Sequence, residues 1–472
     1  MQESLPDPRL DPPTYLTRRR AWLASFDNEQ FGSRVLAEYM WHPDLDGAPA
    51  AVRERSPAPG DWNEARAWVL DHQHLVELIV SAGNKPVFGL PLKAEAVPGT
   101  GEAWIWNRTD GFEVQDIGEQ APLAETLLPH IGVLRSSARL IGSDLRVQAE
   151  EPGFDRAKAV DRFESMLRLA DNATREFRVM LAELVRFSIV DRLLGDVIIA
   201  VRLGAFDAEP DSLGRIAEAI GSVDACQHDE VAAFERLMFD DMRLRVHEHH
   251  GRGLITPLGG AWMGAWGDAE GPVVAPVGFP DTLDTPELRA LAERTGATGR
   301  ANSDAYREAM ERHIQRMTEP AWLDRAPDST EVSTRVFERV AELEGALLLA
   351  EIFMPALDNA TEADRKHRMQ TSAALLELSA RLHLLRHGVW PGSPGEIDGD
   401  LRHGAPWLDL HTGQTLGYVL GDHGPVIYSF GADRDDDGGR PGAPERHVIL
   451  DEDGNVPGDA PDGDWVIFPR AE

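Results

Sequence analysis

The residues with the clearest chemical pattern lie near the C-terminus, where aspartates alternate with other residues before a glycine. Asp433, Asp435, Asp437 and Gly438 follow the D-x-D-x-D-G half of a calcium-binding loop. Alternating carboxylates can converge on a hard cation, and glycine permits the sharp turn between them. The full EF-hand pattern fails, because its twelfth position is Pro444. Two interpretations stay open: an oxygen-ligand cation site, with calcium ahead of magnesium, and a solvated acidic loop.

A group of histidines offers a weaker chemical pattern. His247 and His250 have a spacing that places both on one face of a helix, where they could share a metal ion. The zincin motif H-E-x-x-H is absent, because Gly251 stands where its second histidine would be. A helix end also favours histidine through the helix dipole, and we prefer that structural interpretation. The functional alternative is a metal-dependent hydrolase that uses the His247–His250 cluster beside the glycine- and tryptophan-rich stretch 251–281.

Other catalytic signatures are absent from the sequence. No G-x-S-x-G elbow, P-loop or G-x-G-x-x-G stands between an expected strand and an expected helix. The single cysteine, Cys226, excludes a disulfide framework and any multi-cysteine zinc site. We therefore expect a protein that is not an enzyme.

The charge balance limits the partners. The 472 residues include 47 Lys and Arg against 80 Asp and Glu, so the formal net charge is 47 − 80 = −33. Such acidity argues against binding to nucleic acid or to anionic lipid. The most apolar stretches, 187–206 and 343–357, contain charged residues that are too costly for a lipid span. We expect no membrane span in the given chain, a location in the cell envelope or periplasm if an upstream anchor was removed, and otherwise a cytoplasmic location.

Hydrophobic periodicity predicts a mainly α-helical protein built from antiparallel helical hairpins. Residues 1–120 are mixed, and residues 121–328 form a helical domain interrupted by the loop 251–281. Residues 329–472 carry long helices and then a small α+β module, in which a long helix precedes a short antiparallel sheet. Expected helices include 31–40, 62–81, one capped by Asp155, and 361–387, stopped by Gly388. Expected strands are 103–106, 112–114, 416–420, 426–430, 447–450 and 465–468.

The C-terminal end resembles a known arrangement. A long helix ends in Leu-His-Leu-Leu-Arg-His-Gly-Val-Trp-Pro, and the segments Gly-Gln-Thr-Leu-Gly-Tyr, Tyr-Ser-Phe-Gly-Ala-Asp and Gly-Asp-Trp-Val-Ile follow it. This order looks like the C-terminal part of large proteins found in planctomycete-type bacteria. It is also similar to the globular domain of the major pseudopilins of type II secretion. These four segments are residues 382–391, 413–418, 428–433 and 463–467.

The resemblance implies a function for the acidic residues. In major pseudopilins a long helix packs on a small antiparallel sheet, and a C-terminal loop binds calcium. Carried over, Asp433 and Asp435 would lie in the calcium loop, and Asp464 would close it from the terminal strand. Pseudopilins begin with a membrane helix, whereas this chain has a helical region before the matching helix, so we do not expect it to join a pilus through N-terminal helix stacking. We expect a cell-envelope or scaffold protein with a helical interaction surface, a protein partner or self-association, and structural Ca2+.

Overall fold

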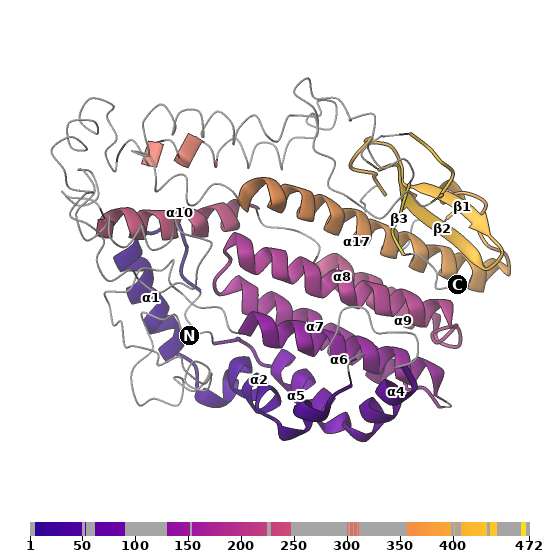
Figure 1. The fold of residues 1–472 in the computed structure, drawn as a ribbon, viewed down its shortest axis with the longest axis horizontal. Helices are drawn as coiled ribbons and strands as arrows, with labels where there is room; N and C mark the ends of the chain where they lie inside the picture. The colour runs from indigo at the N-terminus through magenta and orange to yellow at the C-terminus, as the bar shows by residue number, and fades with distance from the viewer. Residues whose placement is uncertain are drawn as a thin grey trace.

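A computed structural model of the chain is mainly α-helical, with a small three-stranded antiparallel sheet near the C-terminus (Figure 1). The predicted fold class is therefore confirmed. The predicted strands 103–106, 112–114 and 447–450, the loop 251–281 and the helical stretch 329–350 lie outside the described residues. The structure describes residues 5–49, 52, 62–89, 130–151, 153–223, 228–246, 300, 303–304, 306–308, 310, 356–397, 401, 407–431, 435–440 and 464–468.

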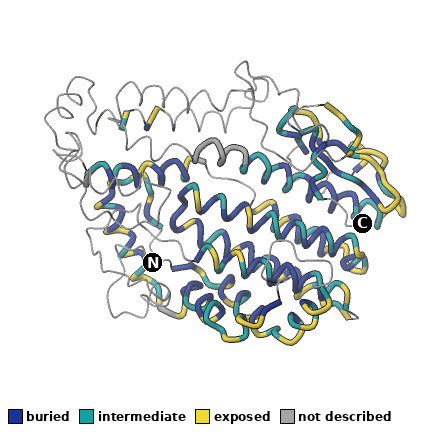
Figure 2. Tube along the Cα trace, viewed as in Figure 1, coloured by how far each residue is buried: buried dark blue, intermediate teal, exposed yellow. Residues whose placement is uncertain are grey.

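The centre of the fold is a layer of long helices that run side by side (Figure 1). Helix α8 packs against both α6 and α17, so it is buried on two sides (Figure 2). Its Val190, Leu194 and Val197 are at most 2% exposed. Burying large aliphatic side chains in this way is the main source of stability for such helices. The helices of this layer are α6 (His130–Glu150), α7 (Arg156–Arg175), α8 (Met180–Arg202), α9 (Pro210–Val223) and α17 (Ala356–His387).

Two of the predicted helix ends are confirmed. Asp155 precedes α7, and its side chain accepts a hydrogen bond from the Lys158 backbone N–H at 3.0 Å. Gly388 follows α17 with φ +76°, the left-handed conformation that ends a helix without steric penalty at glycine. Local chemistry at these positions is enough to set where the helices begin and end.

The N-terminal helices pack beneath this layer and show two differences from the sequence prediction. α1 (Pro12–Ala24) was not expected, and it begins where the Asp11 carboxylate accepts the Thr14 N–H at 3.1 Å. The expected helix 62–81 is two helices, which meet at His72, whose ψ of 34° leaves the helical region. α10 follows α9 and packs against α1 and α8. The remaining elements are η1 (Asn28–Gln30), α2 (Gly32–Met40), η2 (Pro43–Gly47), α4 (Trp62–Asp71), α5 (Gln73–Gly83) and α10 (His228–Val246).

The C-terminal sheet packs on α17. β1 (Gly417–Gly421) and β2 (Gly424–Ser429) form a hairpin with a two-residue turn, and β3 (Trp465–Val466) pairs with β2 on its other edge. Ile427 and Ile467 share a buried cluster with Met369 and Leu376 of α17. The module thus has its own small core, and η9 (Pro394–Glu396) lies in the connection from α17.

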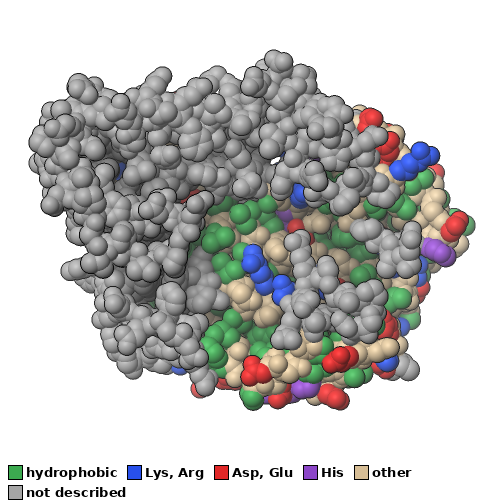
Figure 3. All heavy atoms as spheres, in the orientation of Figure 1, with side chains coloured by type: hydrophobic (Ala, Val, Ile, Leu, Met, Phe, Trp, Pro, Cys, Tyr) green, Lys and Arg blue, Asp and Glu red, His purple; other side chains and the backbone are tan. Residues whose placement is uncertain are grey.

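Acidic side chains are exposed on the described surface, as the excess of Asp and Glu in the composition leads one to expect. Acidic side chains lie along the rim of the described part of the face in Figure 3. Among the helices that the structure describes, none combines the length and the apolar character that crossing a bilayer requires.

One buried acid on α10 holds the start of α8. Glu235 is 8% exposed, and its Oε1 accepts the Met180 backbone N–H at 2.6 Å. Burial raises the pKa of Glu235 to about 7, although this hydrogen bond lowers it. The folded protein therefore retains a proton on Glu235 at pH values where the unfolded chain, with an ordinary glutamate pKa, has released it.

Glu235 is expected to make stability fall as pH rises. The raised pKa means that the free energy of unfolding decreases by roughly 3 kcal/mol between about pH 4.5 and about pH 7 and then stays level. Glu235→Gln keeps an oxygen acceptor and removes the titration, so denaturant melts should show a gain relative to the parent at pH 8 and little change at pH 4. Glu218→Gln, an exposed substitution on α9, is the control for removing a charge. Parallel pH profiles for Glu235→Gln and the parent would contradict this expectation.

Candidate functional site

The structure places Asp464, the residue predicted to close the acidic loop, directly against that loop. The Gly439 backbone N–H donates to Asp464 Oδ2 at 2.7 Å, and the Asp464 N–H donates to the Arg440 carbonyl at 2.9 Å. Asp464 is 2% exposed, whereas Asp435 is exposed and Asp437 is half-buried. The fourth predicted ligand, Asp433, lies outside the described residues.

Backbone geometry explains why the loop and Asp464 meet. Gly438 and Gly439 have φ values of +70° and +77°, which the chain can adopt readily only at glycine. This pair turns the loop so that the Gly439 N–H faces the terminal segment. β3 pairs with β2 immediately after Asp464, which fixes its backbone beside the loop. The predicted role of Gly438 as the turn residue is therefore confirmed in its backbone conformation.

Asp436, which the alternating motif passes over, is the aspartate with the clearest contacts. Its Oδ1 accepts the Tyr428 hydroxyl at 2.8 Å and the Gly438 N–H at 2.9 Å. The second hydrogen bond, which comes from the N–H two residues further on, forms an Asx-turn, a common local arrangement. The D-x-G spacing of Asp436 and Gly438 is the sequence signal that could have identified it.

The electrostatics of this loop favour a counter-charge. Burial first, and the neighbouring carboxylates of Asp436 and Asp437 after it, raise the pKa of Asp464 to about 6, although backbone hydrogen bonds from Gly439 and Asp437 lower it. Burial and the carboxylates of Asp436 and Asp464 also raise the pKa of Tyr428. Asp464 Oδ1 is buried and accepts no hydrogen bond within the described part of the chain. A buried carboxylate oxygen in this setting is destabilised unless a cation or a proton reaches it.

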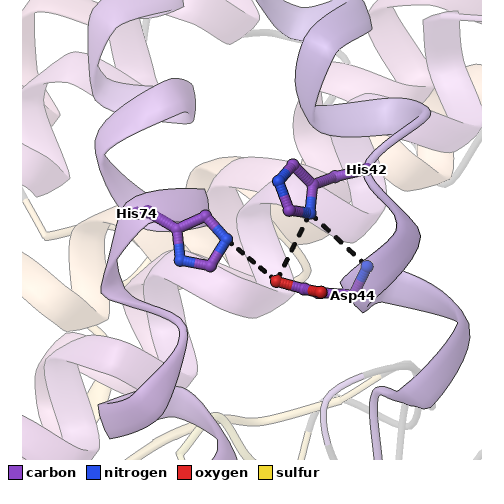
Figure 4. Close-up of side chains that lie close together, drawn as sticks. All are labelled: His42, Asp44 and His74. Atoms are coloured by element: carbon purple, nitrogen blue, oxygen red, sulfur yellow. Dashed lines mark hydrogen bonds and ion pairs between the residues drawn. The ribbon is translucent and has the colours of Figure 1, made fainter.

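A second cluster of metal-type ligands, which was not predicted from the sequence, lies near the N-terminus (Figure 4). His42 and Asp44 flank Pro43 at the start of η2, and His74 is in the first turn of α5. Asp44 Oδ2 is 3.1 Å from His74 Nε2 and 3.5 Å from His42 Nδ1. Among the described residues, this is the one group of three potential ligands whose donor atoms all lie within 4.8 Å of one another. The H-x-D and H-x-H spacings are its only sequence signal.

A buried histidine–aspartate pair between α8 and α17 has a different character. His367 Nδ1 is 2.6 Å from Asp191 Oδ1, and the imidazole stacks on Phe187 with ring centroids 4.5 Å apart. The Gln370 amide, oriented to donate, reaches the same carboxylate. Because the His367 ring is 0% exposed, a substrate cannot approach it. The pair joins two helices and is not a candidate for acid–base chemistry.

The histidines predicted as an alternative metal site cannot be placed. His247, His249 and His250 lie outside the described residues, as does the stretch 251–281. Glu230, an α10 residue earlier in the sequence, forms an ion pair with Arg178, with 3.3 Å between Glu230 Oε2 and Arg178 Nη1. The hydrolase alternative therefore stays a prediction.

Comparisons with known proteins do not narrow the function. No family model matches the chain, and no curated protein and no solved structure shows significant similarity to it. The resemblance of the C-terminal end to planctomycete-type proteins and to major pseudopilins stays a prediction from sequence. The function must be inferred from the two ligand clusters themselves.

Proposed function

We propose that this is a non-enzymatic scaffold or cell-envelope protein whose C-terminal module is stabilised by a calcium ion held at the acidic loop. The proposal is supported above all by the buried carboxylate of Asp464, whose Oδ1 accepts no hydrogen bond within the described part of the chain and whose pKa is raised in part by Asp436 and Asp437. The helical body supplies an extended surface for a protein partner or for self-association. The resemblance of the C-terminal end to pseudopilins supports the same assignment.

The ligand chemistry at the loop suits calcium. Ca2+ takes six to eight oxygen ligands at about 2.3–2.6 Å, in flexible geometry, from carboxylates and backbone carbonyls. Asp437 and Asp464 offer carboxylates from the two sides of the loop, and Asp433 and Asp435 would complete the set. The described carboxylates do not converge as a group of three within 4.8 Å. Like charges repel one another, so a bound cation would draw them closer.

Calcium is expected to raise the melting temperature of the protein at pH 7.5. An ion that binds the folded state alone adds about 2.7 kcal/mol at a concentration of roughly 100 times its dissociation constant. Asp464→Asn keeps an acceptor for the Gly439 N–H but removes the charge, so this variant should fold without calcium and lose the shift. Lowering the pH to 5 should also weaken the response, because protonation of Asp464 competes with the cation. Calorimetric titration and thermal melting measure both effects.

The matched control is Asp422→Asn, an exposed aspartate in the β1–β2 turn of the same module. It removes one negative charge close to the sheet without touching the loop, so the calcium response should persist. A calcium shift that is absent from the parent, or equal in the parent and Asp464→Asn, would disprove the calcium assignment. Light scattering with and without calcium measures self-association.

A further inference from the structure

We propose that His42, Asp44 and His74 form a binding site for a divalent transition metal of the zinc class, independent of the calcium loop. Two imidazoles and one carboxylate form a ligand set that binds Zn2+, Co2+ and Ni2+. The ligands come from two segments that are distant in sequence, since His42 and Asp44 follow α2 and His74 lies in the first turn of α5 (Figure 4). A bound metal would link those two segments.

The two distances from the Asp44 carboxylate to the histidine nitrogens match the ligand-to-ligand distances found around one zinc ion. Four ligands placed tetrahedrally at about 2.0–2.2 Å from zinc are separated from one another by roughly 3.3–3.6 Å. The separations from Asp44 Oδ2 are 3.1 Å to His74 Nε2 and 3.5 Å to His42 Nδ1. Both distances are close to one edge of such a tetrahedron. All three residues offer a ligand atom within 4.8 Å of the other two, so side-chain adjustments can bring them around one ion.

A third histidine borders the site in an orientation typical of metal-binding imidazoles. His72 Nδ1 is 2.7 Å from the Trp68 carbonyl, and the His72 ring stacks on Trp68 with centroids 4.3 Å apart. A carbonyl only accepts, so Nδ1 donates the proton and Nε2 carries the lone pair. That Nε2 lies 3.9 Å from Asp44 Oδ2. Metal-bound histidines usually donate their second nitrogen to a carbonyl or carboxylate in this way.

The backbone holds the ligands in place before any metal binds. In the metal-free protein His42 Nδ1 accepts the Asp44 N–H at 3.4 Å, which fixes the start of η2. A metal ion bound at Nδ1 would replace this weak hydrogen bond, because the nitrogen has one lone pair. α2 and α5 pack closely, because Gly32 allows the backbone to approach the Ala82 carbonyl. Ligands on helix ends that are packed together lose little freedom on binding, which favours affinity.

The site is open on one side, which determines its metal chemistry. The side chains of His42, Asp44 and His74 are 29%, 38% and 47% exposed, so an ion can enter from solvent. Three protein ligands leave a fourth position, at which His72 or a water molecule can bind. Imidazole ligands disfavour Ca2+ and Mg2+, so the two proposed sites should select different ions.

The test uses the full-length chain, stripped with a chelator and titrated with Zn2+ and with Co2+. We expect the parent to bind one more equivalent of metal than the His42→Ala/His74→Ala variant and to develop the visible absorption of tetrahedral Co2+. Asp44→Asn should weaken zinc binding by at least about tenfold, because it removes the one anionic ligand of the set. Circular dichroism of the metal-free variants shows whether each of them is folded. If the double variant is unfolded, the zinc affinity of Asp44→Asn, the mildest change, tests the proposal instead.

The matched control is His383→Ala/His387→Ala, which removes a close histidine pair elsewhere among the described residues, with ring centroids 4.3 Å apart on α17. This control should keep both the extra equivalent of metal and the Co2+ spectrum. Equal stoichiometry and equal spectra in the parent and the His42→Ala/His74→Ala variant would overturn the proposal. Loss of the metal only in the α17 control would overturn it as well. Failure of calcium to bind the parent would leave this result unaffected, because the ligands differ.

Discussion

Replacing Gly83 with alanine is expected to destabilise the helical body strongly. Gly83 is the last residue of α5, and a Cβ there would lie 2.0 Å from the Ser165 carbonyl oxygen of α7. The obstructing atom is backbone within a helix, so it cannot rotate away as a side chain would. The two helices must separate, which opens contacts on both sides of α5. We expect the free energy of unfolding to fall by roughly 3 kcal/mol or more.

Gly195→Ala is the matched control for this prediction. Gly195 lies within α8, and nothing stands within 4 Å of the position its Cβ would occupy. There alanine should stabilise the helix by up to about 1 kcal/mol, because glycine has the lower helix propensity. Denaturant unfolding followed by helical circular dichroism compares the two variants. Similar melting of both would mean that α5 and α7 do not approach as closely as the structure places them.

The sequence predicted the helices where local chemistry and hydrophobic period agree. The cap at Asp155 and the stop at Gly388 depend on neighbouring residues alone, and both were confirmed. α1 was missed because its start is rich in proline, although Asp11 followed by Pro12 is a good helix start. The break at His72 could not be predicted, because the apolar period continues through it and packing decides where the chain bends.

The candidate sites were less accessible to sequence reasoning, for a physical reason. Asp436 and Asp464 are far apart in sequence and meet only because β3 pairs with β2. The resemblance to pseudopilins indicated Asp464, whereas spacing could not. His42 and His74 are brought together by the packing of α2 against α5, which no local pattern encodes. The spacing of residues along the chain can reveal a binding loop within one segment. A site assembled from separate segments can be recognised only once the fold is known.

Glu183→Ala is expected to cause the second large loss of stability. Glu183 lies at the centre of a buried ionic cluster near the start of α8. Glu183 is 1% exposed, and its two oxygens pair with Arg186 Nε at 2.6 Å and with Arg178 Nε at 3.2 Å. Both guanidinium groups are also buried. Removing the carboxylate takes away the acid that these two buried guanidinium groups share and leaves a cavity, while Arg178 keeps its pairs with Glu230 and Asp171. Breaking a buried pair by deleting one partner usually reduces the free energy of unfolding by about 3–5 kcal/mol, and we expect Glu183→Ala to lie in that range.

Two further variants separate the charge from the loss of packing. Glu183→Gln keeps the shape and one acceptor oxygen, so its loss should be smaller than that of Glu183→Ala but still well above the loss from an exposed pair. Arg9→Ala breaks a surface pair with Asp7 whose side chains are both more than half exposed, and it should change stability by less than about 1 kcal/mol. If Glu183→Ala lost no more than Arg9→Ala in the same denaturant melt, the cluster would have to be open to water. If Glu183→Gln lost nothing, cavity formation rather than loss of the carboxylate charge would account for the alanine result.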